Sequence, residues 1–379
     1  MKTASAELPV ASSRQVENPL LPGAVTIACH EHAIPSFIEK ELDQLYQQLN
    51  SSLMHHAVRR KAETASAYVA RRDGRAIAIF LFTQQKQRIN VINEMIDIPG
   101  EELERFSRYI FSKFTDASVI SFSLIGKNIG RLTLPYQQHD SSEDIVLILP
   151  RTPDAYLDAL SPKTRRNIRR YLRAIKHDHP TFRFETTVGA DIQEQYLKDL
   201  ILLKKQNIGA KNLTFGLAEN ELTWIARQAR LTGLVTVALI NEKVCGGSIG
   251  LRVSNHFFGQ VIAYDSAYQK YSPGILCTYL TVCAQILQGG TESHLCWGRY
   301  QYKYKLAGIQ RDRASLDIYR SRAAWWRHAD DILVKKIAST LKGGKNWLLD
   351  REHEEGKIAR VAAVLVQILR KIKRARSAT

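Results

Sequence analysis

The stretch YDSAYQKYSPGILCTYL (264–280) combines features that suit the binding of an anion. A strand-like segment ends at Asp265, a loop rich in Tyr and Ser follows, and a Ser-Pro-Gly sequence begins an apolar run with helical character. The first amides of a helix have no partner within that helix, so they attract anions, phosphate above all. We therefore expect Ser272, Gly274 and Ile275 to bind an anionic group, although a turn made only for packing would explain the same residues.

Four arginines on one side of a second predicted helix could bind the same kind of group. The segment LSPKTRRNIRRYLRAIKHDHP (160–180) begins with a good N-cap serine and a proline at the first helical position. Arg166, Arg169, Arg170 and Arg173 lie opposite an apolar stripe. Arginine forks match phosphate and carboxylate groups. We expect the first three arginines to contact an anionic substrate; a solvated helix face is the alternative.

A third segment, GRYQYKYKLAG (298–308), alternates aromatic and basic residues. In an extended conformation the three tyrosines at 300, 302 and 304 would share one side, with Lys303 and Lys305 on the other. Lys305 could then hold a phosphate or a carboxylate. Tyrosines that only pack on a sheet are the alternative for this pattern.

The composition limits the class of protein. The 379 residues are 45% hydrophobic and carry a net charge of +17, which favours a polyanionic partner such as nucleic acid, an anionic membrane surface or a phosphate-bearing ligand. Five cysteines, an odd number without a Cys-x-x-Cys pair, predict neither a disulfide framework nor a zinc site. No apolar run reaches the roughly 20 residues of a membrane span, and the N-terminus lacks a signal-peptide core. We expect a cytoplasmic protein without a metal.

Two similar α/β units follow one another along the chain. The first has a predicted helix over 34–53, a hairpin with its turn at Asp73-Gly74, a strand ending at Asp97, a helix that begins at Pro99-Gly100 and a further strand. The second repeats this order with a hairpin at Asn241-Glu242, a strand ending at Asp265 and a helix from Ser-Pro-Gly. The hairpins align without a gap. We infer a duplication, with chance similarity as the alternative.

The predicted organisation therefore has four parts. Residues 1–23 form a flexible lead, 24–150 an N-terminal unit, 151–322 a C-terminal unit and 323–379 a basic helical appendage. The final helix, 357–379, carries only basic charges beside an apolar stripe, apart from its polar end. Such a helix can pack on the protein or lie on an anionic membrane, so contact with the inner membrane face is an open expectation.

The residues from Leu160 to Arg320 resemble the GNAT-type acyltransferases found in bacterial cellulose and exopolysaccharide gene clusters, which are distant relatives of the FemAB peptidyltransferases. The similar segments are LSPKTRRNIRR, YDSAYQKYSPGIL and GRYQYKYKLAG, and they cover less than half of the chain. The resemblance implies an α/β fold of two tandem GNAT-like domains. It also implies acyl-CoA, acetyl-CoA above all, as co-substrate, with its pyrophosphate on the loop 270–275.

Acyl transfer requires a base for the nucleophile and an acid for the departing thiolate. We expect Asp265 to act as base or substrate-orienting carboxylate, with a loop-capping Asx turn as the alternative, and Tyr302 to act as the acid. Tyr268 and Lys305 are further substrate contacts. In the N-terminal unit, two glutamates open the corresponding helix and would repel a phosphate. That unit is expected to shape the acceptor groove instead.

Three functions remain open from the sequence. The leading one is an acyltransferase for an envelope or polysaccharide precursor, whose acceptor is a small molecule, a saccharide or a lipid-linked saccharide. The usual GNAT pyrophosphate signature of closely spaced glycines is absent, which leaves room for a FemAB-like enzyme that uses aminoacyl-tRNA. A non-enzymatic protein that binds nucleic acid or membranes would also explain the charge.

Overall fold

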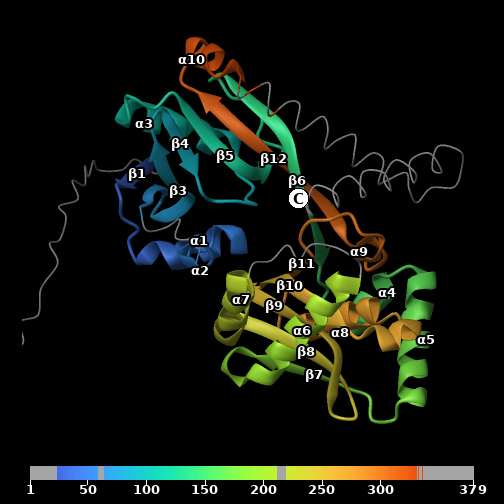
Figure 1. Cartoon of the computed structure of the whole chain (residues 1–379). Helices are drawn as coiled ribbons and strands as arrows, with labels where there is room; N and C mark the ends of the chain where they lie inside the picture. Colours follow the sequence, from blue (N-terminus) through green and yellow to red (C-terminus); the bar gives the residue numbers. More distant parts are fainter. Residues whose placement is uncertain (1–23, 59–63, 211–218, 331, 333–334, 336–379) are drawn as a thin grey trace, which may run out of the picture.

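A single mixed sheet organises the chain in the computed structural model, which describes residues 24–58, 64–210, 219–330, 332 and 335. Its strand order is β1-β2-β3-β4-β5-β12-β6-β11-β10-β9-β8-β7. Helices lie along this sheet in both halves of the chain, so the predicted α/β class is confirmed (Figure 1).

The elements fall into two halves. The N-terminal half contains β1 (Val25–His30), α1 (Phe37–Tyr46), η1 (Leu49–Ser51), α2 (Leu53–Val58), β2 (Ser66–Arg72), β3 (Arg75–Gln85), β4 (Arg88–Val91), α3 (Gly100–Lys113), β5 (Val119–Gly126) and β6 (Tyr136–Ile148). The C-terminal half contains α4 (Pro153–Ala159), α5 (Pro162–Asp178), β7 (Arg183–Val188), η2 (Gly189–Asp191), α6 (Glu194–Ala210), α7 (Glu219–Thr232), β8 (Gly233–Ile240), β9 (Lys243–Val253), β10 (His256–Tyr264), η3 (Ser266–Tyr271), α8 (Pro273–Leu287), β11 (Glu292–His294), α9 (Gln301–Lys305), β12 (Ile309–Tyr319) and α10 (Arg322–Arg327).

The two halves repeat one another, as the sequence predicted. Strands β3 and β9 begin at residues 75 and 243, which are 168 apart, and both hairpins carry a bulge at the same aligned position, after Ala70 and after Ala238. Strands β5 and β11 begin at 119 and 292, and β6 and β12 at 136 and 309, in each case 173 apart. The five extra residues lie in the connection that contains η3. The duplication therefore extends to the last strand of each half.

Strands β6 and β12 exchange partners between the halves. The end of β6 pairs with β11 of the C-terminal half, at Val146–Ile148. The end of β12 pairs with β5 of the N-terminal half, over Arg313–Tyr319. The two strands also pair with each other, and Figure 1 shows them running side by side from one half into the other. The sheet is thus continuous across the predicted domain boundary at residue 150, which stays a prediction.

In the C-terminal half, the two faces of the sheet carry different helices. Alternate residues of a strand point to opposite faces. Val235 and Val237 of β8 share a buried cluster with side chains of α6 and α7. Ala238 and Ile240 of the same strand instead share a cluster with side chains of α5 and α8. Hence the start of α8 and the helices α6 and α7 lie on opposite sides of the sheet.

Three local predictions were wrong. The helix expected over 34–53 ends at Tyr46, because Gln47 adopts a left-handed conformation with φ of 46°, and a separate helix begins at Leu53. The third strand of the N-terminal half ends at Val91, not at Asp97. Residues 301–305 form a helix, so the tyrosines of this segment do not share one side of a strand.

Two predicted parts fall largely outside the described residues. The lead 1–23 and the membrane-contacting helix 357–379 are not described, and of the appendage 323–379 only the region around α10 is. Within the part of the chain that the structure describes, no helix has the length and apolar character needed to cross a membrane.

Candidate active site

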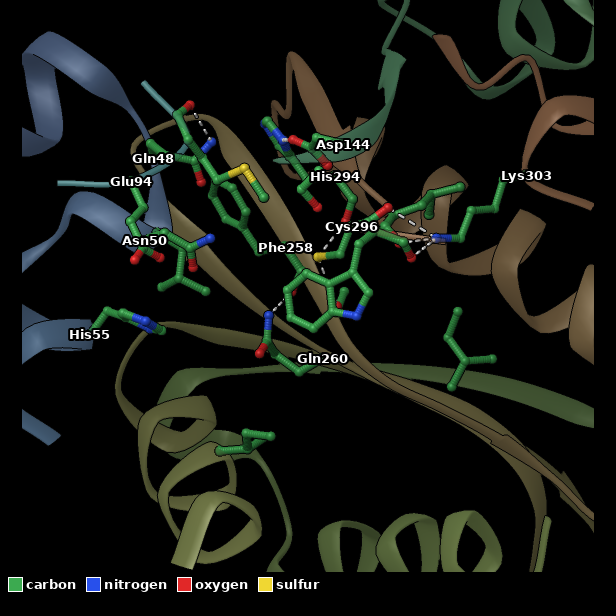
Figure 2. Close-up of a pocket in the computed structure, with 18 of the residues that line it drawn as sticks. Gln48, Asn50, His55, Glu94, Asp144, Phe258, Gln260, His294, Cys296 and Lys303 are labelled. Atoms are coloured by element: carbon green, nitrogen blue, oxygen red, sulfur yellow. Dashed lines mark hydrogen bonds and ion pairs between the residues drawn. The ribbon is translucent and has the colours of Figure 1, made fainter. Parts of the chain in front are cut away.

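A cavity of about 460 Å³ lies where β10 and β11 diverge. The two parallel strands pair only between His256–Phe258 and Glu292–His294, after which β10 continues to Tyr264 and the other segment turns away. Figure 2 shows side chains from both segments around the opening. The residues beyond the paired part that line it are Gly259, Gln260, Ile262, Leu295, Cys296 and Trp297.

Both halves of the chain build the walls of this cavity. The N-terminal half contributes Gln48, Asn50, His55 and Glu94, which lie on one side of the opening in Figure 2. Helices α6 and α7 contribute Lys204, Trp224 and Ile225, so the cavity opens on their face of the sheet. Trp297 and Tyr300 line it as well, although each is 62% exposed.

A buried chain of charged residues closes the deep end. Asp144 Oδ2 lies 2.6 Å from His294 Nδ1, and both residues are almost fully buried. His294 Nε2 is 3.4 Å from Glu292, which Arg311 holds through two bonds of 2.6 and 2.8 Å. Burial alone lowers the pKa of His294, but Asp144 and Glu292 outweigh it and raise that pKa. Phe258 stacks on the imidazole at 4.3 Å between ring centroids.

This arrangement was missed at the sequence level. Asp144 and His294 are 150 residues apart and meet only because β6 crosses into the C-terminal half. The sequence offered one signal, which is that His294 lies inside a short predicted strand. Burying an imidazole there without a polar partner would be costly, so a partner could have been expected.

One group of residues has the composition of a metal site. Ligand atoms of His256, Glu292 and His294 lie within 4.8 Å of one another. However, both carboxylate oxygens of Glu292 already accept hydrogen bonds from Arg311. Because the guanidinium group of Arg311 already occupies this carboxylate, we assign no metal to the three residues.

Lys303 of α9 fixes the segment that follows β11. It is 2% exposed, and its ammonium group donates to the carbonyls of Leu295, Cys296 and Trp297 at 2.7, 3.0 and 2.7 Å. Burial lowers the pKa of Lys303 to about 8. A buried ammonium with three carbonyl partners is a structural clamp, and here it holds one wall of the cavity in place.

Tyr302 lies at the cavity, and Tyr264 lies beside the start of α8. Tyr302 lines the cavity, and burial raises its pKa to about 12, with Tyr300 and other neighbours adding to the effect. Tyr264 is among the groups that act on Tyr302, and its ring lies 3.0 Å from the position that a Cβ on Gly274 would take. The two tyrosines are therefore near enough to interact electrostatically, one of them at the cavity and the other beside Gly274.

The start of α8 gathers several of the predicted anion-binding residues. Tyr171 of α5 has a lowered pKa because of its hydrogen bond with Ser272, which, with Arg170 and Lys305, outweighs the opposing effect of burial. Ser272 has a left-handed backbone with φ of 50°, whereas Gly274 does not have positive φ. The left-handed residue of the turn is therefore the serine, and the glycine instead avoids a contact with Tyr264.

The other predicted residues lie around this cluster. The amide of Ile275 donates to Ser272 O at 3.0 Å, so it is not a bare amide. Arg166 and Arg169 are exposed on α5. Tyr268 packs against His179 with 5.3 Å between ring centroids.

Asp265 is placed away from the cavity walls. Its Oδ1 accepts from the amide of Ala267 at 2.9 Å, which is the capping arrangement considered as the alternative. It is absent from the residues that line the cavity. A catalytic role for Asp265 stays a prediction.

Comparisons with known proteins bear on the fold and on the family of the C-terminal half. Residues 162–304 match the family model of the acetyltransferase (GNAT) domain. No curated protein matches the sequence. The crystal structure of FemX is similar with a TM-score of 0.56 and 10% identity, covering 78% of this chain and 98% of the other. A protein of unknown function from Bacteroides thetaiotaomicron has a TM-score of 0.50 and 10% identity, with 76% and 98% covered.

These matches define what is established for the chain. At 10% identity the two structures show a shared fold and no shared substrate. The family match places a GNAT-type acyltransferase domain in the C-terminal half, over the segment that contains α5, β10, α8 and most of α9.

Proposed function

We propose that the protein transfers an acyl group from acyl-CoA, acetyl-CoA above all, to an acceptor bound in the cavity between β10 and β11. One observation carries this proposal: β10 and α9 each reach both the cavity and the polar, basic cluster at the start of α8. Strand β10 lines the cavity and ends at Tyr264, whose ring lies beside Gly274, while α9 lines the cavity through Tyr302 and acts on Tyr171 through Lys305. We infer a passage between the two, which would suit a long donor with phosphates at one end and a reactive thioester at the other.

The donor's phosphates would bind at the start of α8. Arg170, Tyr171, Ser272 and Lys305 supply charged and hydroxyl donors there, and the helix terminus adds its own positive potential. Arg166 and Arg169 extend the basic surface along α5. No acidic residue opens α8, so nothing in its first turn opposes an anion.

The thioester would then lie in the gap between the strands. The register of β10 against β9 shifts between Gly259 and Val261, which leaves Gln260 out of the regular ladder beside the cavity. A backbone amide at such a bulge can stabilise the oxyanion of the tetrahedral intermediate. Tyr302, whose raised pKa keeps its phenol protonated at neutral pH, would give a proton to the departing thiolate.

The acceptor we propose is an envelope or polysaccharide precursor. Trp297 and Tyr300 present exposed aromatic surface at the cavity, and Gln48, Asn50 and Gln260 present amides. Aromatic faces with a few amide groups suit a ring that carries hydroxyl groups. We place the reaction in the cytoplasm, where CoA thioesters are made.

The test is the replacement Gly274→Val. The valine would press on the ring of Tyr264, which lies 3.0 Å from the Cβ position, and would narrow the donor passage. When acetyl-CoA is present at a hundred times its dissociation constant, the free energy of unfolding of the wild type should rise by about 2.7 kcal/mol. We expect the variant to lose this gain while its melting temperature without ligand changes little.

A substitution at the far end of α8 serves as control. Gly289 has φ of 75° and nothing near its Cβ position, so Gly289→Val should lower stability but preserve the acetyl-CoA effect. An acetyl-CoA effect that survives in Gly274→Val would contradict the proposed passage. A wild type that responds to aminoacyl-tRNA, with steep salt dependence, and not to acetyl-CoA would replace the donor.

A further inference from the structure

Each of the two exchanged strands carries a buried aspartate that contacts a side chain of the neighbouring strand. Asp144 of β6 meets His294 of β11, and Asp317 of β12 meets Ser121 of β5. Each is 3% exposed, and each lies on the strand that has crossed into the other half. Their surroundings differ in one respect that bears on the reaction.

Asp317 has donors on both carboxylate oxygens. Its Oδ1 accepts from Ser121 at 2.6 Å and lies 3.4 Å from an Arg88 nitrogen. Its Oδ2 accepts from the ammonium group of Lys335. This aspartate is therefore satisfied by the protein alone.

Asp144 has a donor on one oxygen only. Its Oδ2 is bound to His294, whereas Oδ1 is buried and has no hydrogen-bond donor among the described residues. Leaving a buried carboxylate oxygen without a donor costs about 1–3 kcal/mol or more, so such an atom calls for an explanation. Asp144 lines the cavity, and Figure 2 shows it beside His294 at one end of the opening.

We propose that Asp144 binds the nucleophilic group of the acceptor through Oδ1 and takes its proton during transfer. The inference rests on the proposed function. His294, Lys303 and Arg311 all lie close enough to interact electrostatically with this carboxylate. The acceptor group is an N–H or O–H, because only a donor can satisfy Oδ1.

The reaction step balances as follows. The acceptor nitrogen or oxygen forms a bond to the acyl carbon while the carbon–sulfur bond breaks, and the electron pair leaves with sulfur. The acceptor proton moves to Asp144 Oδ1, and the thiolate receives a proton from Tyr302. Asp144 then releases its proton to solvent and Tyr302 regains one.

Hydroxylamine tests the proposal because it is small enough to enter any acceptor cavity. With acetyl-CoA it yields acetohydroxamic acid and free thiol, which is followed with a thiol reagent. We expect Asp144→Asn to lower kcat by about 10²–10⁴-fold, the range for a positioned acid–base group, with the KM for acetyl-CoA within about twofold. The matched control is Asp317→Asn, which should leave both constants within about twofold.

The outcomes separate the two proposals. No thiol release by the wild type would overturn the acyl-CoA function and this inference together. Normal kcat in Asp144→Asn, or a change confined to the KM for acetyl-CoA, would overturn the role of Asp144 and leave the proposed function standing. If Asp144→Asn does not fold, Asp144→Glu retains the charge beside His294 but moves the second oxygen, and the same loss of kcat is expected. If neither folds, Asp144 is structural and the inference fails.

Discussion

The start of α3 in the N-terminal half and the start of α8 in the C-terminal half are equivalent, yet only one is open. A Cβ on Gly100 of α3 would lie 2.1 Å from the carbonyl oxygen of Ile129, so backbone already covers this helix end. Two glutamates occupy its first turn. At α8 the three atoms nearest to the corresponding position all belong to the ring of Tyr264, and the first turn has no acidic residue.

The difference fits the proposal that only the C-terminal half binds the donor. In the N-terminal half the chain itself fills the space, and Asp97 is held by Arg313 at 2.6 Å. In the C-terminal half five additional residues, around η3, separate Asp265 from the helix. The N-terminal half instead lends residues such as Asn50 and Glu94 to the cavity of its neighbour.

The largest effect should come from breaking the strand exchange. Leu316 is fully buried in the core of the N-terminal half, although it belongs to β12, the last strand along the chain. Leu316→Ala should lower the free energy of unfolding by about 2–5 kcal/mol, because it leaves a cavity in that core. Hydrogen exchange should show the loss of protection in β3, β4 and β5.

The reciprocal change sharpens this test. Leu147 of β6 is buried in a cluster with residues of α5 and α8, so Leu147→Ala should loosen the C-terminal half first. The opposite pattern, with Leu316→Ala loosening the C-terminal half and Leu147→Ala loosening the N-terminal half, would contradict the prediction. The exchanged strands would then not stabilise the half into which they cross.

A smaller effect is expected at the two helix starts. Gly100→Ala should cost about 1–3 kcal/mol, because its Cβ cannot fit beside the Ile129 carbonyl without a backbone shift. Gly274→Ala should change stability by less than about 1 kcal/mol, because the helix propensity of alanine offsets a mild contact with Tyr264. Thermal unfolding of both variants without ligand checks the contrast, and equal losses would remove the distinction between a filled and an open end.

The smallest effect concerns pH and the buried imidazole. His294 has a raised pKa, and the groups around it are Asp144, Glu292, His256 and Arg311. A histidine whose pKa is higher in the folded state stabilises the protein below about pH 6.5, and this contribution is lost as pH rises through the folded-state value. His294→Gln should therefore be more destabilising at about pH 6 than at about pH 9 in urea unfolding.

A neighbouring histidine provides the control for that prediction. Burial lowers the pKa of His256, although Glu292 opposes the effect. Its contribution is therefore present above about pH 6.5 and lost as pH falls, so His256→Gln should cost more stability at about pH 9 than at about pH 5, the reverse of His294→Gln. An effect of His294→Gln that does not vary with pH would mean that the imidazole is neutral in the folded protein.

Local patterns predicted the fold well. The turns at Asp73-Gly74 and Asn241-Glu242, each with positive φ at both residues, and the helix that begins at Pro273 depend on neighbouring residues in the chain. Those signals fix hairpins and helix starts before any tertiary contact forms. The short helix at 301–305 was missed because alternation in a five-residue segment does not distinguish a strand from a single helical turn.

The deep end of the site could not be predicted in this way. Asp144 meets His294 through a strand that leaves its own half, and no local pattern encodes that crossing. The cluster of Arg170, Ser272 and Lys305 was predicted as residues of the right kind, but only the structure shows that Tyr171 brings them together.

The exchange of β6 and β12 also constrains how the chain can be made. Val119 pairs with Tyr319, 200 residues later, so the sheet of the N-terminal half stays incomplete until almost the entire described chain has left the ribosome. Until then β5 presents an open edge in a nascent polypeptide, a state prone to wrong pairing. Synthesis from the N-terminus cannot finish one half before starting the other, and the last strand translated in the sheet is the one that completes the first half.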